Sequence, residues 1–378
     1  MPNYKIALTA GLAMFAMFFG SGNLVFPLII GMKTTDQFLT ASIGLMITGV
    51  LVPFMGLFSM ILYNGDKDKY FGLLGKNAPF VLSLLILSLI GPFGVVPRCF
   101  VVAYGSLHVL FPDMPIVLFS SVFAILIYII ICQKNQVVPI IGKILGPFKI
   151  GGILLIIIAA IYQSPELISM PHDGSPLFLG ISQGYQTMDL MAAYFFSITI
   201  IEYLRSVSSN KEETIKLSIA SAIVGAVLIS LVYFGFIYLG AHYSLHLATI
   251  LPEQYLTTIA HLTLGKYATF IVALTILLSC LATAASLVRL FAEFLRIDVA
   301  KEKITWNNSL IITLVISFAL SLTGFSTIFN ILGTVLAYIY PALIALTIAA
   351  ILKQYYDFKW TKHCFWTTLI IATVYNLY

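Results

Sequence analysis

Apolar runs of about 20 residues, repeated along the chain, constrain this sequence more than any other feature. The hydrocarbon core of a bilayer is about 30 Å thick, and a helix of about 20 apolar residues crosses it. Of the 378 residues, 60% are hydrophobic and only 9% are charged, which leaves too few polar side chains to cover a soluble globule. The sequence therefore predicts an all-α integral membrane protein.

Charged or turn-forming clusters separate ten complete runs and a partial one. We expect membrane helices near residues 5–31, 38–63, 78–110, 114–132, 138–162, 178–204, 215–241, 266–290, 308–324 and 327–352, with a partial eleventh at 363–378. No Pro-, Gly- or Ser-rich linker divides the chain. We therefore predict a single transmembrane domain over residues 1–378.

Basic residues are distributed unevenly between the loops. If the N-terminus is cytoplasmic, the outer side keeps little beyond Lys33 and Lys266. The inner loops and helix ends then receive Lys67, Lys69, Lys76, Lys134, Lys143, Lys149, Lys211, Lys216, Lys301, Lys303, Lys353, Lys359, Lys362, Arg205, Arg289 and Arg296. This asymmetry predicts a cytoplasmic N-terminus. It also accounts for the net charge of +5 without a nucleic-acid partner.

The first run contains FFGSGNLVFP, residues 18–27, where a membrane helix should be most regular. Glycine lowers the cost of leaving the helix, Ser and Asn bond locally to the backbone, and proline cannot donate to the preceding turn. Gly20 and Gly22 could instead let another helix pack closely. A break is tolerated at membrane depth only where it is buried or lines a cavity.

The sixth run carries a second polar, glycine-bearing stretch that ends in GYQTMD, residues 184–189. An ionisable residue inside a membrane helix is a functional candidate, which singles out Asp189. The same carboxylate could be the N-cap of a following half-helix, Leu190–Tyr203, and that role is compatible with a site nearby.

The two interrupted runs are five apart, which suggests two halves of five helices at 1–162 and 178–352. Because five is odd, the halves run in opposite directions across the membrane. Interrupted helices at corresponding positions of inverted halves are typical of secondary transporters with a binding site at the midplane.

Five stretches together resemble bacterial branched-chain amino acid:cation symporters: FFGSGNLVFP, GPFGVVPR (91–98), GKILGPFKI (142–150), GYQTMD, and LSCLATAASL…AEF (278–294). They follow in the family's order from the first helix to the tenth. The resemblance implies the amino acid–polyamine–organocation superfamily and its LeuT-like five-plus-five inverted-repeat fold, with discontinuous helices 1 and 6 and about 11 transmembrane segments. Since members usually have twelve helices, we expect the C-terminal region here to be short or missing.

The resemblance also implies a substrate site at the two breaks. Backbone amides near Gly20, from Ser21, Gly22 and Asn23, would hold the substrate carboxylate, because half-helix N-termini present unpaired N–H groups. The ammonium would be received at the second break, shaped by Gly184, Gln186, Thr187 and Asp189. Tyr104 is a weaker candidate, because an aromatic residue there is more often a packing residue than a ligand contact. Phe195, Phe196 and Val102 lie at a suitable depth for the apolar pocket but are also ordinary core residues.

The coupling ion implied by the resemblance is sodium, held by the carbonyls of Ala16 and Phe19 together with Ser279 and Thr283. Ala282 stands where the first of two adjacent hydroxyls is expected. Ser279, on the same helix face, could contribute its own hydroxyl. Proton coupling, through Asp189 or an altered cage, therefore stays open. No organic cofactor is expected.

The expected function is import of leucine, isoleucine and valine across the bacterial inner membrane, with an alternative in another small neutral amino acid. The expected partners are this substrate and membrane lipid. No filter-like repeat suggests a channel. No catalytic set at membrane depth suggests an enzyme, since Asp189 stands alone. We expect Arg98 to have a structural or gating role and not to contact the substrate, because it would repel the substrate's ammonium end.

Overall fold

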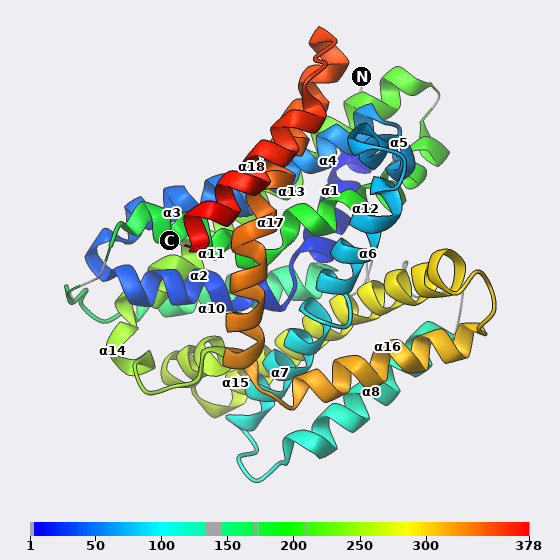
Figure 1. The fold of residues 1–378 in the computed structure, drawn as a ribbon. Helices are drawn as coiled ribbons and strands as arrows, with labels where there is room; N and C mark the ends of the chain where they lie inside the picture. Colours follow the sequence, from blue (N-terminus) through cyan, green and yellow to red (C-terminus); the bar gives the residue numbers. More distant parts are fainter. Residues whose placement is uncertain (1–3, 133–145, 170, 172–173, 209, 378) are drawn as a thin grey trace.

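The computed structural model describes residues 4–132, 146–169, 171, 174–208 and 210–377. Lys134, Lys143 and the beginning of the run at 138–162 lie outside the described residues. Among these residues the chain forms helices and connecting turns (Figure 1).

The first half contains α1 (Tyr4–Phe18), α2 (Ser21–Thr34), α3 (Phe38–Met46), α4 (Val52–Leu62), α5 (Lys67–Phe71), α6 (Ala78–Ile90), α7 (Val95–His108), α8 (Ile116–Cys132) and α10 (Gly146–Tyr162). The second half contains α11 (Pro176–Thr187), α12 (Asp189–Val207), α13 (Lys211–His242), α14 (Ser244–Leu247), α15 (Tyr255–Phe294), α16 (Trp306–Ser321), α17 (Phe325–Tyr356) and α18 (Thr361–Leu377). A π-helical stretch, η2 (Ile47–Leu51), joins α3 to α4, and the short 3-10 turn η5 (Pro252–Gln254) precedes α15.

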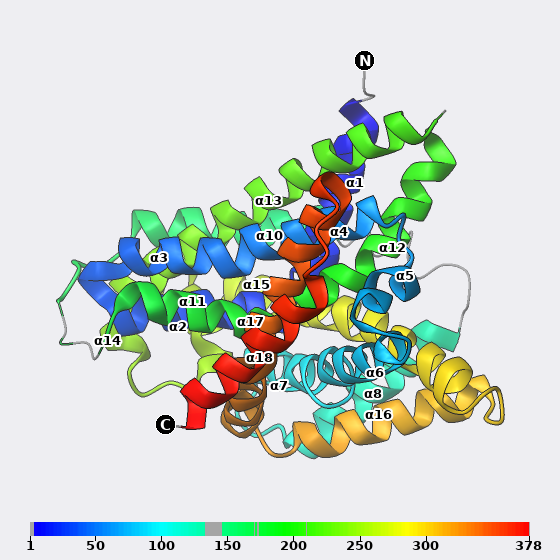
Figure 2. The same cartoon turned by 45° about the horizontal axis from the view of Figure 1, so that its top comes forward.

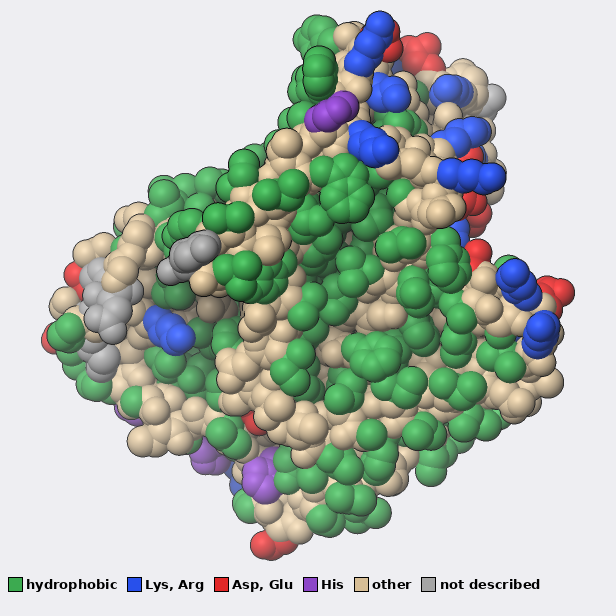
Figure 3. Space-filling model, viewed as in Figure 1, with side chains coloured by type: hydrophobic (Ala, Val, Ile, Leu, Met, Phe, Trp, Pro, Cys, Tyr) green, Lys and Arg blue, Asp and Glu red, His purple; other side chains and the backbone are tan. Residues whose placement is uncertain are grey.

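Six helical stretches of the described chain are long and apolar enough to cross a membrane: 21–62, 78–108, 189–207, 211–242, 252–299 and 325–356. Four shorter apolar helices accompany them. Leu39, Ile43, Ile47 and Leu51, four residues apart, are exposed along one face of α3 and η2, as expected for side chains that face lipid. Figure 3 shows apolar side chains over much of the visible surface, with Lys and Arg gathered mainly toward its upper right.

Both predicted breaks are present. α1 ends at Phe18, Gly20 is extended (φ −110°, ψ −158°), and α2 begins at Ser21. The Asn23 side chain stabilises this restart, because its Oδ1 accepts the N–H of Gly20 at 3.2 Å. In the sixth run, Met188 adopts the left-handed conformation (φ 58°, ψ 19°) between α11 and α12, which is costly for a residue with a side chain. We call these the first break (Phe19–Gly20) and the second break (Met188).

A third interruption differs from the expectation of one continuous helix at 78–110. α6 ends at Ile90 and α7 begins at Val95, with Gly94 at φ −144° and ψ −85°. The stretch between them is Gly91-Pro92-Phe93-Gly94, and Pro92 has no N–H with which to continue the helix. The turn places Val95 and Arg98 beside the other two breaks.

The halves of the broken helices pack against different partners. α1 and α2 both lie on α13, whereas α11 lies on α3 and α12 on α4, an arrangement that Figures 1 and 2 show from two directions. Glycines permit the closest crossings: a Cβ on Gly240 would lie 2.2 Å from the carbonyl oxygen of Leu28, and one on Gly180 would lie 2.1 Å from that of Ala41. These positions require glycine because backbone contacts backbone there.

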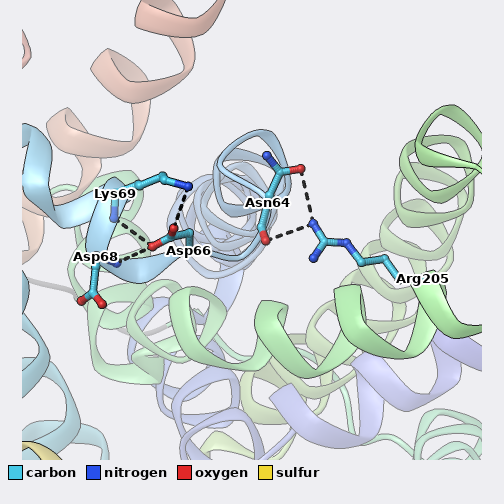
Figure 4. A network of polar contacts seen from close by, with 5 residues as sticks. All are labelled: Asn64, Asp66, Asp68, Lys69 and Arg205. Atoms are coloured by element: carbon cyan, nitrogen blue, oxygen red, sulfur yellow. Dashed lines mark hydrogen bonds and ion pairs between the residues drawn. The ribbon is translucent and has the colours of Figure 1, made fainter.

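Polar contacts order the turn between α4 and α5 (Figure 4). Asp66 is the N-cap of α5, and its Oδ1 accepts the N–H groups of Asp68 (3.1 Å) and Lys69 (3.0 Å). Arg205 at the end of α12 donates to the carbonyl oxygen of Asn64 at 3.1 Å. The turn after α4 therefore contains both the N-cap of α5 and a hydrogen bond to α12.

Candidate functional site

The first and second breaks meet in the interior. A Cβ on Gly22 would lie 3.3 Å from the Cα of Thr187 and 3.4 Å from the carbonyl oxygen of Gln186. α2 therefore begins directly against the end of α11. At this point the first N–H groups of α2 and the last carbonyls of α11 both lack partners within their own helices.

Asp189 joins the two breaks to α13. Its Oδ2 accepts a hydrogen bond from Asn23 Nδ2 at 2.8 Å and another from the hydroxyl of Tyr233 at 2.8 Å. The Asn23 amide also contacts the Tyr233 hydroxyl. All three side chains are buried. Because a carboxylate can accept about four hydrogen bonds, Asp189 keeps capacity for a further donor.

A small cavity of ≈ 20 Å³, with room for about one water molecule, lies between the breaks. Its glycine and polar lining consists of residues that were singled out from the sequence, Thr283 for the ion and the others for the substrate: Gly20, Ser21, Gly22, Asn23, Thr187, Asp189 and Thr283. Its apolar lining was mostly not identified from the sequence: Met17, Phe18, Ile90, Val95, Met188, Ala192, Phe196 and Leu287. Their only signal in the sequence is their position near the breaks, since buried apolar residues look alike in every helix.

Arg98 occupies one side of this centre and is fully buried. Its Nη1 donates to the carbonyl oxygen of Gln186 at 2.8 Å, and its guanidinium lies 5.2 Å from the ring centroid of Phe26. The Gln186 side chain in turn donates through Nε2 to the carbonyl oxygen of Phe329 at 3.3 Å, and the rings of Phe26 and Phe329 are 5.8 Å apart. These contacts connect α2, α7, α11 and α17, and we call them the outer closure.

A larger cavity of ≈ 490 Å³ lies on the opposite side of the centre. α1, α12 and α15 supply its lining: Ala13, Ala16, Met17, Phe195, Phe196, Ile198, Thr199, Glu202, Ala285, Ser286, Arg289, Leu290 and Glu293. Met17 and Phe196 line both cavities, so these two side chains separate the centre from the larger space. We call this space the inner cavity.

Lys149 lies where the resemblance places a sodium ion. Its Nζ donates to the carbonyl oxygen of Ala16 at 3.3 Å and also to that of Phe19. The residue is only 4% exposed, although the charge pattern assigned it to the cytoplasmic loops and helix ends. Ser279 Oγ donates to the same Phe19 carbonyl at 3.3 Å, whereas the buried Thr283 Oγ1 has no hydrogen-bond partner among the described residues.

The remaining predicted residues lie outside the central cavity. Tyr104 donates to the carbonyl oxygen of Met114 at 3.0 Å and lies 3.1 Å from His108 Nδ1, so its hydroxyl is used at the end of α7. Gly184 packs closely against Thr48, whose Oγ1 would lie 2.0 Å from an added Cβ. Gln186 acts through its backbone and amide on the outer closure. Val102 is buried core.

Known proteins are similar to this chain over nearly its whole length. A family model described as "Branched-chain amino acid transport protein" matches residues 3–378. The branched-chain amino acid permease BrnQ of Bacillus subtilis is 27% identical over 97% of this chain and 85% of its own length, and that of Corynebacterium glutamicum is 26% identical over 97% and 86%.

Among solved structures, MhsT in complex with L-phenylalanine superposes with a TM-score of 0.66 at 16% identity, covering 97% of this chain and 96% of MhsT. At this identity the likeness shows the fold alone. The fold is the LeuT-like inverted repeat that the family resemblance implied.

Proposed function

The chain belongs to the branched-chain amino acid transport protein family, and we propose that it carries leucine, isoleucine and valine across the membrane by alternating access, driven by a cation gradient. Like the family, it is a multi-pass membrane transporter and not an enzyme. The observation that carries the proposal is the meeting of two broken helices around one central cavity.

The substrate carboxylate binds at the first break in this proposal. The N–H groups of Ser21, Gly22 and Asn23 begin α2 without partners in their own helix, and the positive end of the helix dipole lies there. The substrate ammonium binds at the second break, where Asp189 lines the cavity and retains acceptor capacity. Opposite charges of the substrate thus meet opposite ends of the site.

The substrate side chain packs against apolar residues of the central cavity. Ile90, Val95, Ala192, Phe196 and Leu287 supply methyl, methylene and aromatic groups. Each CH₂ buried contributes about 0.8 kcal/mol. One methylene therefore changes affinity modestly, and we expect leucine, isoleucine and valine to compete for one site.

The arrangement of the cavities fits a state that is closed on its outer side and still separated from the inner cavity by Met17 and Phe196. The outer closure links four helices through Arg98, Gln186 and Phe329, whereas the inner cavity reaches Met17 and Phe196. The central cavity is too small for leucine, so a wall must move before the substrate binds. We propose that α1 and α12 move against α13 and α4, and that the outer closure opens in the alternate state.

We place the protein in the bacterial inner membrane with its N-terminus in the cytoplasm. This orientation rests on the Lys and Arg that gather around the ends of α4, α12 and α15. The inner cavity, with Glu202, Arg289 and Glu293 in its lining, then faces the cytoplasm. Its charged side chains are consistent with a water-filled space.

Exchange in proteoliposomes tests the proposal without reference to an ion. Vesicles that contain the purified chain and unlabelled leucine should take up external labelled leucine, and excess isoleucine or valine should suppress that uptake. Excess alanine and phenylalanine serve as the comparison. Absence of exchange would refute the transport function, and stronger suppression by alanine would move the specificity to small neutral amino acids.

A further inference from the structure

The residues at the first break do not fit a sodium ion. The carbonyls of Ala16 and Phe19, which the resemblance assigns to sodium, both accept hydrogen bonds from Lys149 Nζ. The same ammonium lies 5.3 Å from the ring centroid of Phe19. A second cation so close to it would be repelled, and Ala282 supplies no side-chain oxygen.

The position of Lys149 is built for a cation. α1 ends at Phe18, so its last carbonyls have no partner within the helix and the negative end of the dipole lies there. α10, which carries Lys149, packs on α1, α13 and α15. Lys149 as a residue is only 4% exposed, and its ammonium has no carboxylate within ion-pair distance among the described residues. Carbonyl oxygens and an aromatic face are therefore its described partners.

We propose that Lys149 replaces the coupling ion, and that the cation this protein moves with its substrate is a proton carried on the Lys149 amine. This proposal rests on the transport function proposed above. When α1 holds its carbonyls against α10, the ammonium is bound by them. When α1 swings away, the amine loses those partners, releases its proton to water and becomes neutral.

The inner cavity supplies a route for that proton. Ala16, whose carbonyl accepts a hydrogen bond from Lys149, also lines this cavity. A proton released there passes to water on the inner side, and the neutral amine accepts another from water in the outward-facing state. One N–H bond breaks and one forms in each cycle, so one proton enters with each substrate and no other reactant is consumed.

Other titratable groups near Lys149 must be distinguished from it. The thiols of Cys280 on α15 and Cys99 on α7 interact electrostatically with its ammonium, and both residues are buried. α13 contributes the buried Tyr233, which is bonded to Asp189, and Arg98 lies on α7. The buried residues of α1 include no titratable side chain. Asp189 is thus the competing proton carrier in the lining of the central cavity, and Glu202 and Glu293 are those in the lining of the inner cavity.

The test compares three conditions in proteoliposomes: leucine exchange without gradients, uptake driven by an inside-alkaline pH gradient without sodium, and uptake driven by a sodium gradient at equal pH. A gradient of about one pH unit can accumulate leucine about tenfold at one proton per leucine, because both ratios represent the same free energy. The wild type should accumulate leucine with the pH gradient and not with sodium alone. A pH-sensitive dye inside the vesicles should report acidification when leucine is added.

Lys149→Gln should lose pH-driven accumulation and leucine-induced acidification while leucine exchange continues. Lys149→Arg keeps the charge but does not release a proton, so it should also lose pH-driven accumulation and keep leucine exchange. It replaces the Gln variant in this test if that variant does not fold. Lys33→Gln, which removes an exposed ammonium from α2, is the matched control and should resemble the wild type.

Two outcomes would overturn the role of Lys149. One is sodium-driven accumulation by the wild type, and the other is normal pH-driven accumulation by both Lys149 variants. A wild type that fails even to exchange leucine would instead refute the transport function. The two failures are thereby kept apart.

Discussion

At the scale of single residues, Gly22 shows how little space the centre allows. Its Cα faces Thr187 and the Gln186 carbonyl across the two breaks. A side chain there would push apart two helix ends and cover the amides of α2. Close helix packing and a functional break were two explanations for this glycine. Both describe the same contact, because the close approach at Gly22 brings the two breaks together.

Gly22→Leu should abolish leucine exchange, because its side chain meets backbone atoms of Gln186 and Thr187 and fills the central cavity. The measurement is exchange per purified protein, with monodispersity by gel filtration as the check on folding. Gly151→Leu is the control, since a Cβ on Gly151 has open space around it. Exchange at the wild-type rate in Gly22→Leu would contradict the proposed site.

Asp189→Asn should weaken leucine binding by about one to two orders of magnitude, because an unpaired buried ammonium or a lost charged hydrogen bond costs about 1–3 kcal/mol. Tyr233→Phe removes one of the two donors to Asp189 but leaves the carboxylate, so its effect should be smaller. Isothermal titration of both variants with leucine measures the difference. If Asp189→Asn bound leucine with the same affinity as the wild type, Asp189 would only hold the helices together.

Residue types in the sequence were sufficient to find the breaks but not the long-range partners. Glycines, amides and a carboxylate stand out in an apolar run because lipid cannot satisfy them, which singled out the residues from Gly20 to Asn23 and Asp189. Lys149 looked like an ordinary charge at a helix end. Its contact with Phe19 spans 130 residues, and no local pattern encodes such a distance.

At the scale of elements, helix positions followed from hydropathy because each crossing must be apolar and about 20 residues long. The interruption between α6 and α7 was missed, although Gly91 and Pro92 were quoted as part of a motif. Proline and glycine occur in continuous membrane helices as well, because neighbouring helices can satisfy the freed backbone. α17, for example, continues through Pro341.

Gly240→Val should destabilise the contact between α2 and α13. The added side chain meets the Leu28 backbone, which cannot rotate away as a side chain can, and overpacking typically costs about 1–3 kcal/mol. The thermal unfolding midpoint in detergent should fall. Gly151→Val adds the same atoms at an open position of α10, and a similar fall in both variants would attribute the effect to β-branching.

Asp66→Ala should destabilise the start of α5 by about 1 kcal/mol, the usual value of an N-cap. The backbone N–H of Lys69 lowers the pKa of Asp66 in the folded state. The stabilisation is therefore present above the ordinary pKa of about 3.9 and is lost as pH falls through the lower, folded value. Unfolding midpoints of the wild type and the variant should differ at neutral pH and converge in acid. Asp68→Ala, next to the cap, is the control.

At the scale of the whole molecule, the two sides of the centre are unequal. The outer closure is built from Arg98, Gln186 and two phenylalanines, whereas Met17 and Phe196 stand between the centre and the inner cavity. The sequence predicted two inverted halves but could not indicate this inequality. Two halves related by a pseudo-two-fold axis allow the central cavity to open toward either side of the membrane. The tertiary contacts alone decide which side is open in this structure.

Thiol labelling tests which side is open. Ser286 lines the inner cavity, so Ser286→Cys, in a background that lacks Cys132 and Cys364, should react with a membrane-impermeant reagent applied from the N-terminal side. Ser317→Cys, at a fully buried position of α16, should not react. Labelling of Ser286→Cys only from the opposite side would reverse the proposed orientation.

The ammonium beside the first break is tethered to α10 by its own side chain, so it is present at its site whatever the salinity of the surroundings. A transporter that depends on a dissolved ion stalls when that ion becomes scarce in the habitat. A leucine auxotroph that relies on this protein should therefore grow as fast in sodium-free medium as in brine. Alkaline surroundings, where protons are scarce, should limit its growth instead.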